Sequence, residues 1–492
     1  MAPPLQKGPK GTRDLYPEDV LRLNYIRKAW RDTAVRHGFD EVEGPTFEHS
    51  ELYAVKSGDA ILGELFQAFS GKDPKEVEAV KDTGRGPYAM RPEFTPSLAR
   101  MYAAKAGQLP KPCRWFTAGP YFRAERPQRG RLREFQQWNV DVLGLAESEA
   151  SVDASRHTAE ADVIAVVIGL FETLGLKPDQ LRIKLGSRDA VSMSMQQFGL
   201  DPSLEGRVLQ LLDDRPKIGP DKYIEQAASL GLPDGFVKFH HPKQRIVMRL
   251  DDTPETLTER YPEFANNPEG VTAHIDRQES AKHSPGTLQH ALFAAGLQGW
   301  CEFDSMIVRG LAYYTGTVFE AIADGERAVC GGGRYDNLVQ LFGGPETPAV
   351  GFGMGDVVLS LLLDDRGVLP EGSDLREALS LAPAGLRPDA FVLAANDEAA
   401  ERVPAVLTDL RRTTSMIDPT GIGLHARRST KSTRNVGKLL KDAANQHARF
   451  AVILESPTEA SIKDLGTGDQ AGGIGIETLR TELAGRLGRA CQ

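Results

Sequence analysis

One stretch of the sequence, residues 116–144, constrains the fold more than any other. Its two ends have the patterns of strands: residues 115–124 are rich in aromatic side chains, and residues 134–143 alternate large and polar side chains. The segment between them, 126–131, combines proline, glycine and arginine, which is typical of a turn. The sequence therefore predicts a β-hairpin with a basic tip. Five arginines lie at or near that tip: Arg123, Arg126, Arg129, Arg131 and Arg133.

Strand alternation predicts which side chains of this hairpin share a face. Arg123 and Glu125 point to one side of the first strand, and Gln137, Asn139 and Asp141 to one side of the return strand. If the two faces coincide, one open sheet surface carries a cation, an amide and a carboxylate. Such a surface can hold a phosphate with a second small polar molecule beside it. An exposed hairpin with solvated charges is the alternative interpretation.

The length of the chain, 492 residues, favours two to four domains over a single core. Its 40% hydrophobic and 26% charged residues are ordinary for a soluble protein. No apolar run is long enough for a membrane span, and the first residues lack the apolar centre of a signal peptide. The four cysteines are scattered without a CxxC pair, which favours a reducing compartment and argues against a structural zinc site. We expect a cytoplasmic protein.

The formal net charge of −9 does not by itself indicate a nucleic-acid-binding protein. Any such partner must be held by a local basic patch. The C-terminal part offers one, after a segment of linker composition at 380–388. An α/β pattern follows there, with strands at 390–395 and 449–455 and a helix at 397–412. The basic residues lie between the two strands: Arg411, Arg412, Arg427, Arg428, Lys431, Arg434, Lys438 and Lys441. A solvated face is the alternative interpretation.

A second polar constellation precedes the hairpin, in residues 88–96. A strand runs there into a proline-punctuated turn and a helix beginning at about Ser97. Glu93 and Thr95 are two residues apart and face the same way on an extended segment, where a carboxylate and a hydroxyl suit an ammonium group. The alternative is that Thr95 or Ser97 caps the helix and Glu93 is merely nearby.

From 191 to 299 the chain becomes polar and helical in patches, with one possible strand at 246–250. We expect an inserted helical module separate from the sheet. Strand patterns resume from 301 to 324. They enclose the sequence RGLAYYTG at 309–316, which combines Arg309 with two tyrosines, and packing within the sheet is the alternative role for those tyrosines.

Two glycine-rich stretches come next in the chain. Residues 331–333 are three consecutive glycines, and 349–355 reads as a glycine-rich strand leading into a helix that Asp356 could cap. Glycines at such positions let the backbone approach a ligand or a neighbouring strand closely.

Taken together, these motifs resemble one family. The hairpin is similar to motif 2 of class II aminoacyl-tRNA synthetases, and residues 39–45, ending in proline, resemble the end of their motif 1. RGLAYYTG resembles the histidine-specific signature of the histidyl-tRNA synthetases, and the order of the motifs is similar throughout. The C-terminal residues 431–454 resemble that family's anticodon-binding domain. The resemblance covers nearly the whole chain, with the region around 190–300 matching only as an insertion.

The resemblance implies an α+β fold with an antiparallel-sheet catalytic core. That core would comprise residues 1–190 and 300–378, interrupted by a helical insertion at 191–299, with an α/β anticodon-binding domain at 388–492. The implied reaction joins L-histidine to the 3′ end of tRNA(His), with ATP and Mg²⁺, through a histidyl-adenylate, and releases AMP and pyrophosphate. A cytoplasmic homodimer with no membrane contact is also implied, and the spacing of the residues indicates no metal site.

The resemblance also implies roles at matching positions. Arg123 would hold the α-phosphate of ATP and the substrate carboxylate, Arg309 would be the catalytic arginine opposite it, and Arg131 would contact ATP or the tRNA acceptor end. The histidine site would comprise Glu93, Phe94, Thr95, Gln137, Asp141, Tyr313 and Tyr314. Contacts with tRNA would come from Arg129, Arg427, Lys431, Arg434 and Lys438.

One departure from the family pattern bears on function. The usual third motif ends in a Glu-Arg pair whose arginine stacks on adenine, but this chain has Val357 and Val358 there. The departure favours an alternative, the histidine-binding regulatory subunit of ATP phosphoribosyltransferase, which resembles the synthetase core. The intact signature around Arg309 and the basic C-terminal domain oppose it. A class II synthetase for another amino acid is a third reading, which the YYTG context opposes.

Overall fold

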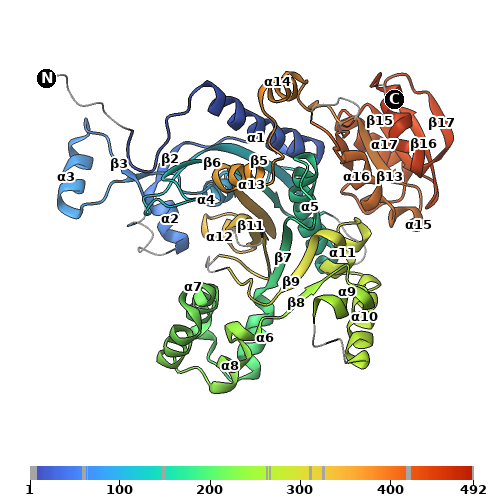
Figure 1. The fold of residues 1–492 in the computed structure, drawn as a ribbon. Helices are drawn as coiled ribbons and strands as arrows, with labels where there is room; N and C mark the ends of the chain where they lie inside the picture. The colour runs from blue at the N-terminus through green and yellow to red at the C-terminus, as the bar shows by residue number, and fades with distance from the viewer. Residues whose placement is uncertain are drawn as a thin grey trace.

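The computed structural model of the chain describes residues 8–57, 63, 65–146, 151–261, 264, 267–309, 313–323, 327–416, 421 and 423–489. A large sheet forms the centre of the molecule (Figure 1). A group of helices lies below it in this view, and a smaller sheet with its own helices lies beside it, at the C-terminal end.

The central sheet has nine strands in the order β1-β5-β6-β12-β11-β10-β7-β9-β8. Its pairings are antiparallel except β1 with β5 and β7 with β9. The strands are β1 (Asp40–Glu41), β5 (Cys113–Phe122), β6 (Glu134–Leu143), β7 (Arg182–Ser187), β8 (Val247–Arg249), β9 (Cys301–Asp304), β10 (Thr317–Ile322), β11 (Ala328–Arg334) and β12 (Ala349–Gly355). The predicted α+β fold built on an antiparallel sheet is confirmed.

The predicted hairpin is the pair β5 and β6, and it lies inside the sheet rather than exposed. β6 pairs with β5 on one side and with the glycine-rich β12 on the other. The connecting turn closes through backbone hydrogen bonds between Gln128 and Arg131, with Gly130 at a φ of 75°. Glycine suits that left-handed position because it has no Cβ.

Long helices cover one face of this sheet and form the main core with it. The helices are α1 (Pro17–Arg36), α5 (Val152–Thr173), α13 (Asp356–Asp365) and α14 (Gly372–Ser380). α5 is apolar on nearly all sides, from Val163 to Phe171, because it is enclosed by α1, the sheet and neighbouring helices. The Trp30 ring of α1 stacks on Trp138 of β6 with centroids 6.1 Å apart. The sequence also predicts a long helix over 147–175, and its first residues, 147–150, lie outside the described residues.

The opposite face of the sheet carries a second apolar cluster, which includes Phe94, Tyr121 and Tyr335. A three-stranded sheet, β2-β4-β3, lies beside it with short helices. These elements are β2 (Phe47–His49), β3 (Gln67–Ala68), β4 (Tyr88–Met90), α2 (Ser50–Ser57), α3 (Pro74–Thr83), α4 (Thr95–Ala103) and α12 (Leu338–Leu341).

The segment expected to be a separate helical module has two parts. The helices are α6 (Arg188–Gln197), α7 (Glu205–Ser229), α8 (Asp234–Phe239), α9 (Pro254–Arg260), α10 (Pro268–Lys282) and α11 (Leu288–Ala294). α6 to α8 enclose a small core of their own, to which Val308 also belongs. β8 instead adds a strand to the central sheet, and Leu288 and Leu292 of α11 join the main core. The second part is therefore not separate from the sheet, because its apolar side chains are buried against it.

The C-terminal sheet has the order β14-β13-β15-β16-β17, with the first three strands parallel. The elements are β13 (Ala390–Ala394), α15 (Asp397–Ala400), α16 (Val403–Arg411), β14 (Ala426–Arg428), α17 (Val436–Asn445), β15 (Phe450–Leu454), β16 (Glu459–Asp464), β17 (Gln470–Gly475) and α18 (Leu479–Arg486). The helix expected at 397–412 is two helices, because Pro404 near the start of α16 lacks the N–H that would continue α15.

An ion cluster joins this C-terminal unit to the central sheet. Asp162 of α5 pairs with Arg114 of β5 and with Arg428 of β14, the latter at 2.9 Å. Burial alone would raise the pKa of Asp162, but the nearby arginines, Arg411 included, outweigh it and lower the pKa to about 2. The carboxylate is therefore charged at neutral pH and links the two units.

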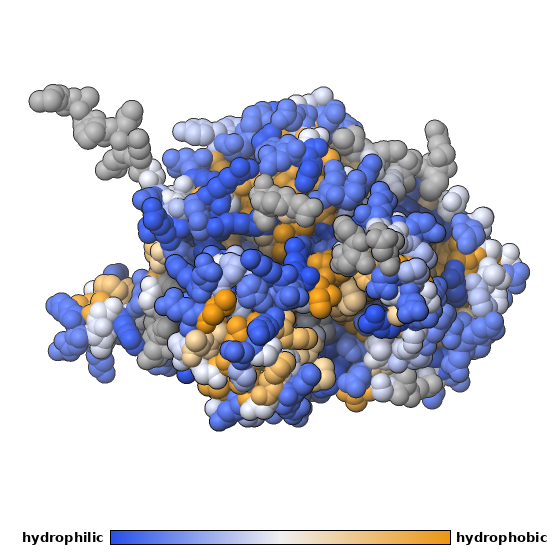
Figure 2. Space-filling view, turned by 60° about the horizontal axis from the view of Figure 1, so that its bottom comes forward, coloured by the Kyte–Doolittle hydropathy of each residue, from blue (hydrophilic) through white to orange (hydrophobic). Residues whose placement is uncertain are grey.

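Hydrophilic side chains cover most of the face that Figure 2 shows, with apolar groups in scattered patches. Among the exposed large apolar residues, Met193, Ile224 and Phe239 lie on α6 to α8. In the described ranges, no helix combines the length and the apolar character that crossing a membrane requires.

Candidate active site

A small cavity of about 80 Å³ opens on the face of the central sheet away from the long helices. Side chains from both predicted constellations and from the signature segment line it. They include Glu93, Thr95, Arg123, Gln137, Arg309, Tyr313 and Tyr314. The convergence of charged and amide groups from three distant parts of the chain makes this cavity the candidate active site.

The glycines of β11 and β12 make the space for these side chains. A Cβ at Gly331 would collide with the guanidinium of Arg309, and a Cβ at Gly351 would collide with the carboxylate of Asp141. At Gly333 it would lie 2.9 Å from the Tyr314 ring. The close approach that the glycines permit is therefore made by predicted site residues of neighbouring segments.

Arg309 lies at one side of the cavity and forms an ion pair with Glu320 of β10 at 2.5 Å. Its guanidinium lies over the Tyr314 ring, 5.8 Å from the centroid. Burial raises the pKa of Glu320, and the positive charge of Arg309 opposes that shift. The Nε of Arg309 has no hydrogen-bond partner among the described residues. A donor of this side chain is thus left for an oxygen-rich ligand.

Arg123 lines the same cavity from the end of the hairpin. Its Nε donates a hydrogen bond of 3.1 Å to the carbonyl of Pro92, and its guanidinium lies 5.1 Å from the Phe135 ring centroid. Burial lowers the pKa of Arg123, and the carboxylate of Glu93 opposes that shift. Two arginines therefore converge on one small space, which is favourable for a phosphate with several negative oxygens.

The polar groups expected to hold an ammonium lie together at the cavity wall. Thr95 is the first residue of α4, whose N-cap is Phe94 without a side-chain hydrogen bond, so the capping alternative for Thr95 does not apply. The Tyr313 hydroxyl lies 3.5 Å from an oxygen of Glu93. Phe94 itself is fully buried in the apolar cluster behind the cavity and does not line it.

Asp141 is buried next to the cavity but does not line it, and it lies on the same face of β6 as Gln137, which does. The Tyr335 hydroxyl donates a hydrogen bond of 2.6 Å to Oδ1 of Asp141. Burial raises the pKa of Asp141 to about 7; the hydrogen bond from Tyr335 opposes this, and the charge of Glu93 adds to it. Next to it, Gln137 donates to Oδ1 of Asn139 at 2.7 Å.

Sequence reasoning missed the roles of three residues around this cavity. Tyr335 stands in GGGRYD beside the glycines, and its partner Asp141 is 194 residues away. Strand alternation already put Asn139 on the polar face of the hairpin, but it was not predicted as a site residue. Arg188 donates to the carbonyl oxygens of Arg309 and Tyr314, and no sequence signal pointed to it.

The tip of the hairpin places the remaining basic residues outside the cavity. Arg131 pairs with Glu125, and Arg129 reaches Asp365 of α13 at 3.3 Å. Val358, one of the two valines that replace the Glu-Arg pair of the third motif, lies beside Gly130 of this tip. Asp356, which begins the same helix, pairs with Arg13 at 2.6 Å.

The basic residues of the C-terminal unit fall into two groups. Arg427 donates to Asp40 of β1 at 2.7 Å, so it lies at the interface with the central sheet. Lys431 pairs with Asp442 at 3.3 Å and Arg434 with Asp397 at 2.7 Å. The pair of Arg434 with Asp397 lies at the surface, whereas Lys431 is exposed and its partner Asp442 is buried. Lys438 on α17 is exposed.

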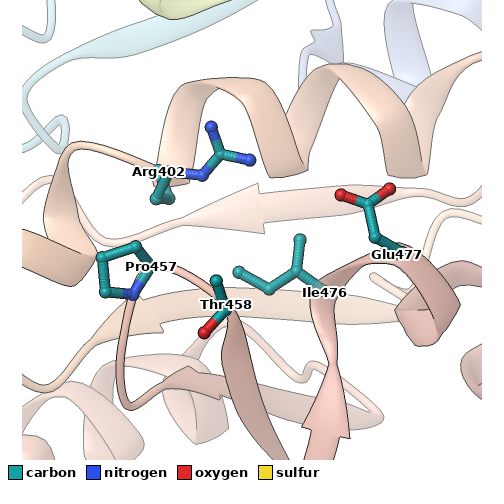
Figure 3. A pocket seen from close by; sticks show the side chains of 5 residues that line it. All are labelled: Arg402, Pro457, Thr458, Ile476 and Glu477. Atoms are coloured by element: carbon teal, nitrogen blue, oxygen red, sulfur yellow. The ribbon is translucent and has the colours of Figure 1, made fainter.

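A second hollow, of about 310 Å³, lies in the C-terminal unit (Figure 3). It is lined by Arg402, Pro457, Thr458, Ile476 and Glu477. None of these five is a predicted site residue. Although it is larger, it brings together a single arginine and a single carboxylate, so the smaller cavity on the central sheet remains the candidate active site.

Comparisons with known proteins identify relatives over most of the chain. The sequence profile of the family described as histidyl-tRNA synthetase matches residues 11–356. Histidine--tRNA ligase of Opitutus terrae is 38% identical over 73% of this chain and 75% of its own length. The enzyme of the same name from Halobacterium salinarum is 31% identical over 94% of both chains.

The fold is also similar to solved structures. One is described as an ATP phosphoribosyltransferase regulatory subunit/histidyl-tRNA synthetase from Bacillus halodurans, with a TM-score of 0.54, 21% identity and coverage of 93% of this chain and 99% of that one. At that identity the likeness establishes the fold alone.

Proposed function

Since the chain belongs to the histidyl-tRNA synthetase family, we propose that it is a histidine--tRNA ligase whose active site is the cavity between Arg123 and Arg309. The enzyme activates L-histidine with ATP and transfers the histidyl group to the 3′ end of tRNA(His). The observation that carries the assignment of the site is the meeting of two arginines with Glu93 and Gln137 in one cavity.

The first step joins the histidine carboxylate to the α-phosphorus of ATP, and the bond to the leaving pyrophosphate breaks. The nucleophile is already an anion, so no general base is required. The reaction needs alignment of the two reactants and positive charge around the phosphorus. Arg123 and Arg309 supply that charge from two sides, and arginine suits the task because its planar fork can bind two oxygens.

Recognition of histidine follows from the polar groups of the cavity. Glu93, Thr95 and Gln137 bind the ammonium, while Asp141 and a tyrosine hydroxyl, from Tyr313 or Tyr314, bind the imidazole nitrogens. A site that pairs both ring nitrogens rejects analogues that lack them, because its own buried polar groups are then left unpaired. The Tyr335–Asp141 hydrogen bond supports this role, since it fixes one oxygen of the carboxylate next to the cavity that Tyr335 lines.

The second step transfers histidine from the adenylate to the terminal ribose hydroxyl of tRNA and releases AMP. Arg129 and Arg131 at the hairpin tip are placed to meet the acceptor end. The exposed residues Lys431, Arg434 and Lys438 of the C-terminal unit bind the phosphate backbone of the tRNA. Arg427 contributes less directly, because its guanidinium pairs with Asp40.

ATP carries Mg²⁺ into the site as part of the substrate, and the metal neutralises phosphate charge there. A cytoplasmic homodimer completes the proposal. The free, buried thiols of Cys113, Cys301 and Cys330 fit a reducing compartment. Light scattering on the purified protein tests the dimer, and a monomer that retains full charging activity contradicts it.

A catalytically silent histidine-binding regulatory subunit is the second candidate, favoured by the pair Val357–Val358 in place of the third-motif Glu-Arg. Charging of tRNA(His) with labelled histidine in the presence of ATP distinguishes the two. Accumulation of histidyl-tRNA supports the ligase. Histidine binding without any charging supports the regulatory function.

A further inference from the structure

The backbone of Arg309 has an unusual conformation. Its φ is 53°, in the left-handed region that residues with a Cβ rarely adopt. Such a conformation persists only where the surroundings hold it, and it often marks a functional position. The contacts that hold this residue therefore determine where its guanidinium lies.

Arg188 makes the contacts that hold both ends of the segment from Arg309 to Tyr314. Its Nη2 donates to the carbonyl oxygen of Arg309 at 3.2 Å, and its Nη1 donates to the carbonyl oxygen of Tyr314. Its backbone N–H donates to the carbonyl of Gly316 at 2.9 Å. One side chain thus spans the segment that carries the signature arginine and both tyrosines.

Arg188 is itself fixed in place by regular structure. It follows β7 directly and begins α6, whose N-cap Ser187 accepts a hydrogen bond from the N–H of Ala190. β7 pairs with β10 so that Ser187 faces Thr317, which places Arg188 beside the end of the signature segment. The residue is 6% exposed, so water does not compete strongly for its hydrogen bonds.

The residues before Arg309 lie between two apolar clusters. Ile307 belongs to the cluster behind the cavity, and Val308 belongs to the core of α6 to α8. Arg309 then turns back toward the cavity, where it meets Gly331 and Glu320. Packing fixes the entry of the segment, and the Arg188 hydrogen bonds fix its two ends.

We propose that Arg188 is a positioning residue for catalysis: by bridging the carbonyl oxygens of Arg309 and Tyr314, it holds the Arg309 guanidinium in the cavity beside Glu320. It does not touch the substrates. The role rests on the proposed function, because the position of Arg309 matters to the rate only if the cavity activates an amino acid. Arginine suits this role because its planar guanidinium can donate to two carbonyl groups at once, whereas the donors of a lysine ammonium all lie on one nitrogen.

The test is histidine-dependent ATP–pyrophosphate exchange by Arg188→Met and Arg188→Lys. Arg182→Met is the matched control, because Arg182 begins β7, the strand that Arg188 follows, and donates to the carbonyl of Gly299 at 3.0 Å, away from the cavity. We expect Arg188→Met to lower kcat by roughly a hundredfold with a much smaller change in the KM for ATP, and Arg188→Lys to be intermediate. The control should stay within about twofold, and thermal unfolding identifies variants that do not fold.

A double-mutant cycle separates positioning from general support of the fold. In the Arg309→Ala background, Arg188→Met should cause little further loss, because its effect passes through Arg309. An equal loss in both backgrounds overturns the proposal, and so does an Arg188→Met variant with kcat near that of the parent protein. If the parent protein itself lacks histidine-dependent exchange, the proposed function fails instead.

Discussion

The hydroxyl of Tyr335, which lines the cavity, donates a hydrogen bond of 2.6 Å to Oδ1 of Asp141. The two residues come from β6 and from the residue directly after β11, and both are buried. The bond fixes the direction of a carboxylate that lies on the same strand face as Gln137. It therefore fixes the Asp141 carboxylate behind the cavity wall to which Tyr335 and Gln137 belong.

Tyr335→Phe should weaken histidine binding, because Asp141 loses the donor that orients it. A hydrogen bond to a charged group is worth about 1.5 to 3 kcal/mol, so the dissociation constant should rise roughly tenfold to a hundredfold. Isothermal titration calorimetry measures it. The matched control is Tyr121→Phe, since the Tyr121 hydroxyl is buried with no hydrogen-bond partner among the described residues. Unchanged affinity in Tyr335→Phe would contradict this role.

Asp141 should make the stability of the ligand-free protein depend on pH. Burial raises its pKa from 3.8 to about 7, so the folded protein keeps a proton that the unfolded chain has lost over this range. The contribution to the free energy of unfolding is fully present below about pH 4 and is lost as the pH rises through 7. Thermal unfolding at pH 5 and pH 8 should show a larger fall in Tm for the parent protein than for Asp141→Asn. Equal falls in Tm for the two proteins would contradict the raised pKa of Asp141.

Gly331→Ala should impair activation by displacing the Arg309 guanidinium, which occupies the space that a Cβ needs. Loss of one positioned cation at the reacting phosphate costs about 3 to 4 kcal/mol, so we expect kcat to fall roughly a hundredfold to a thousandfold. Pyrophosphate exchange gives the rate. Gly107→Ala is the control, because a Cβ there meets no atom within 4 Å. A Gly331→Ala variant with full activity would rule out this arrangement of Arg309.

Charge reversal at Arg434 and Lys438 should weaken tRNA charging and spare histidine activation. We expect the KM for tRNA to rise about tenfold or more, with a smaller salt dependence, because phosphate contacts are lost. The ion pair of Arg434 with Asp397 is exposed, so its loss should hardly affect folding. Arg480→Glu with Arg486→Glu on α18 is the charge-matched control. If charging and exchange fall together, the C-terminal unit supports folding rather than tRNA binding.

Local patterns in the sequence predict much of the fold. The hairpin strands were expected at 115–124 and 134–143, and the structure has β5 at Cys113–Phe122 and β6 at Glu134–Leu143. Alternation along two strands joined by a short basic turn is a local signal, and so is the i, i+2 spacing that brings Glu93 and Thr95 to the same cavity. The prediction of one helix over 397–412 was wrong, because the chain breaks before Pro404 into α15 and α16.

Contacts between distant residues could not be predicted in this way. The sequence predicts one basic patch in the C-terminal part, yet two of its members, Arg427 and Arg428, pair with acidic residues 387 and 266 positions away in the chain. Tyr335 and Arg188 likewise acquire their roles from partners brought close by the sheet. Strand order determines these contacts, and a single sequence carries no local signal for strand order.

The most direct test of the central claim is ATP–pyrophosphate exchange by the purified protein with each amino acid in turn. We expect exchange with histidine alone, which would also show that the chain compensates for the valines at 357 and 358. We further expect Arg309→Ala to lower the exchange rate roughly a hundredfold to a thousandfold while histidine binding persists. Absence of histidine-dependent exchange in a folded protein that binds histidine would contradict the account and favour the regulatory function.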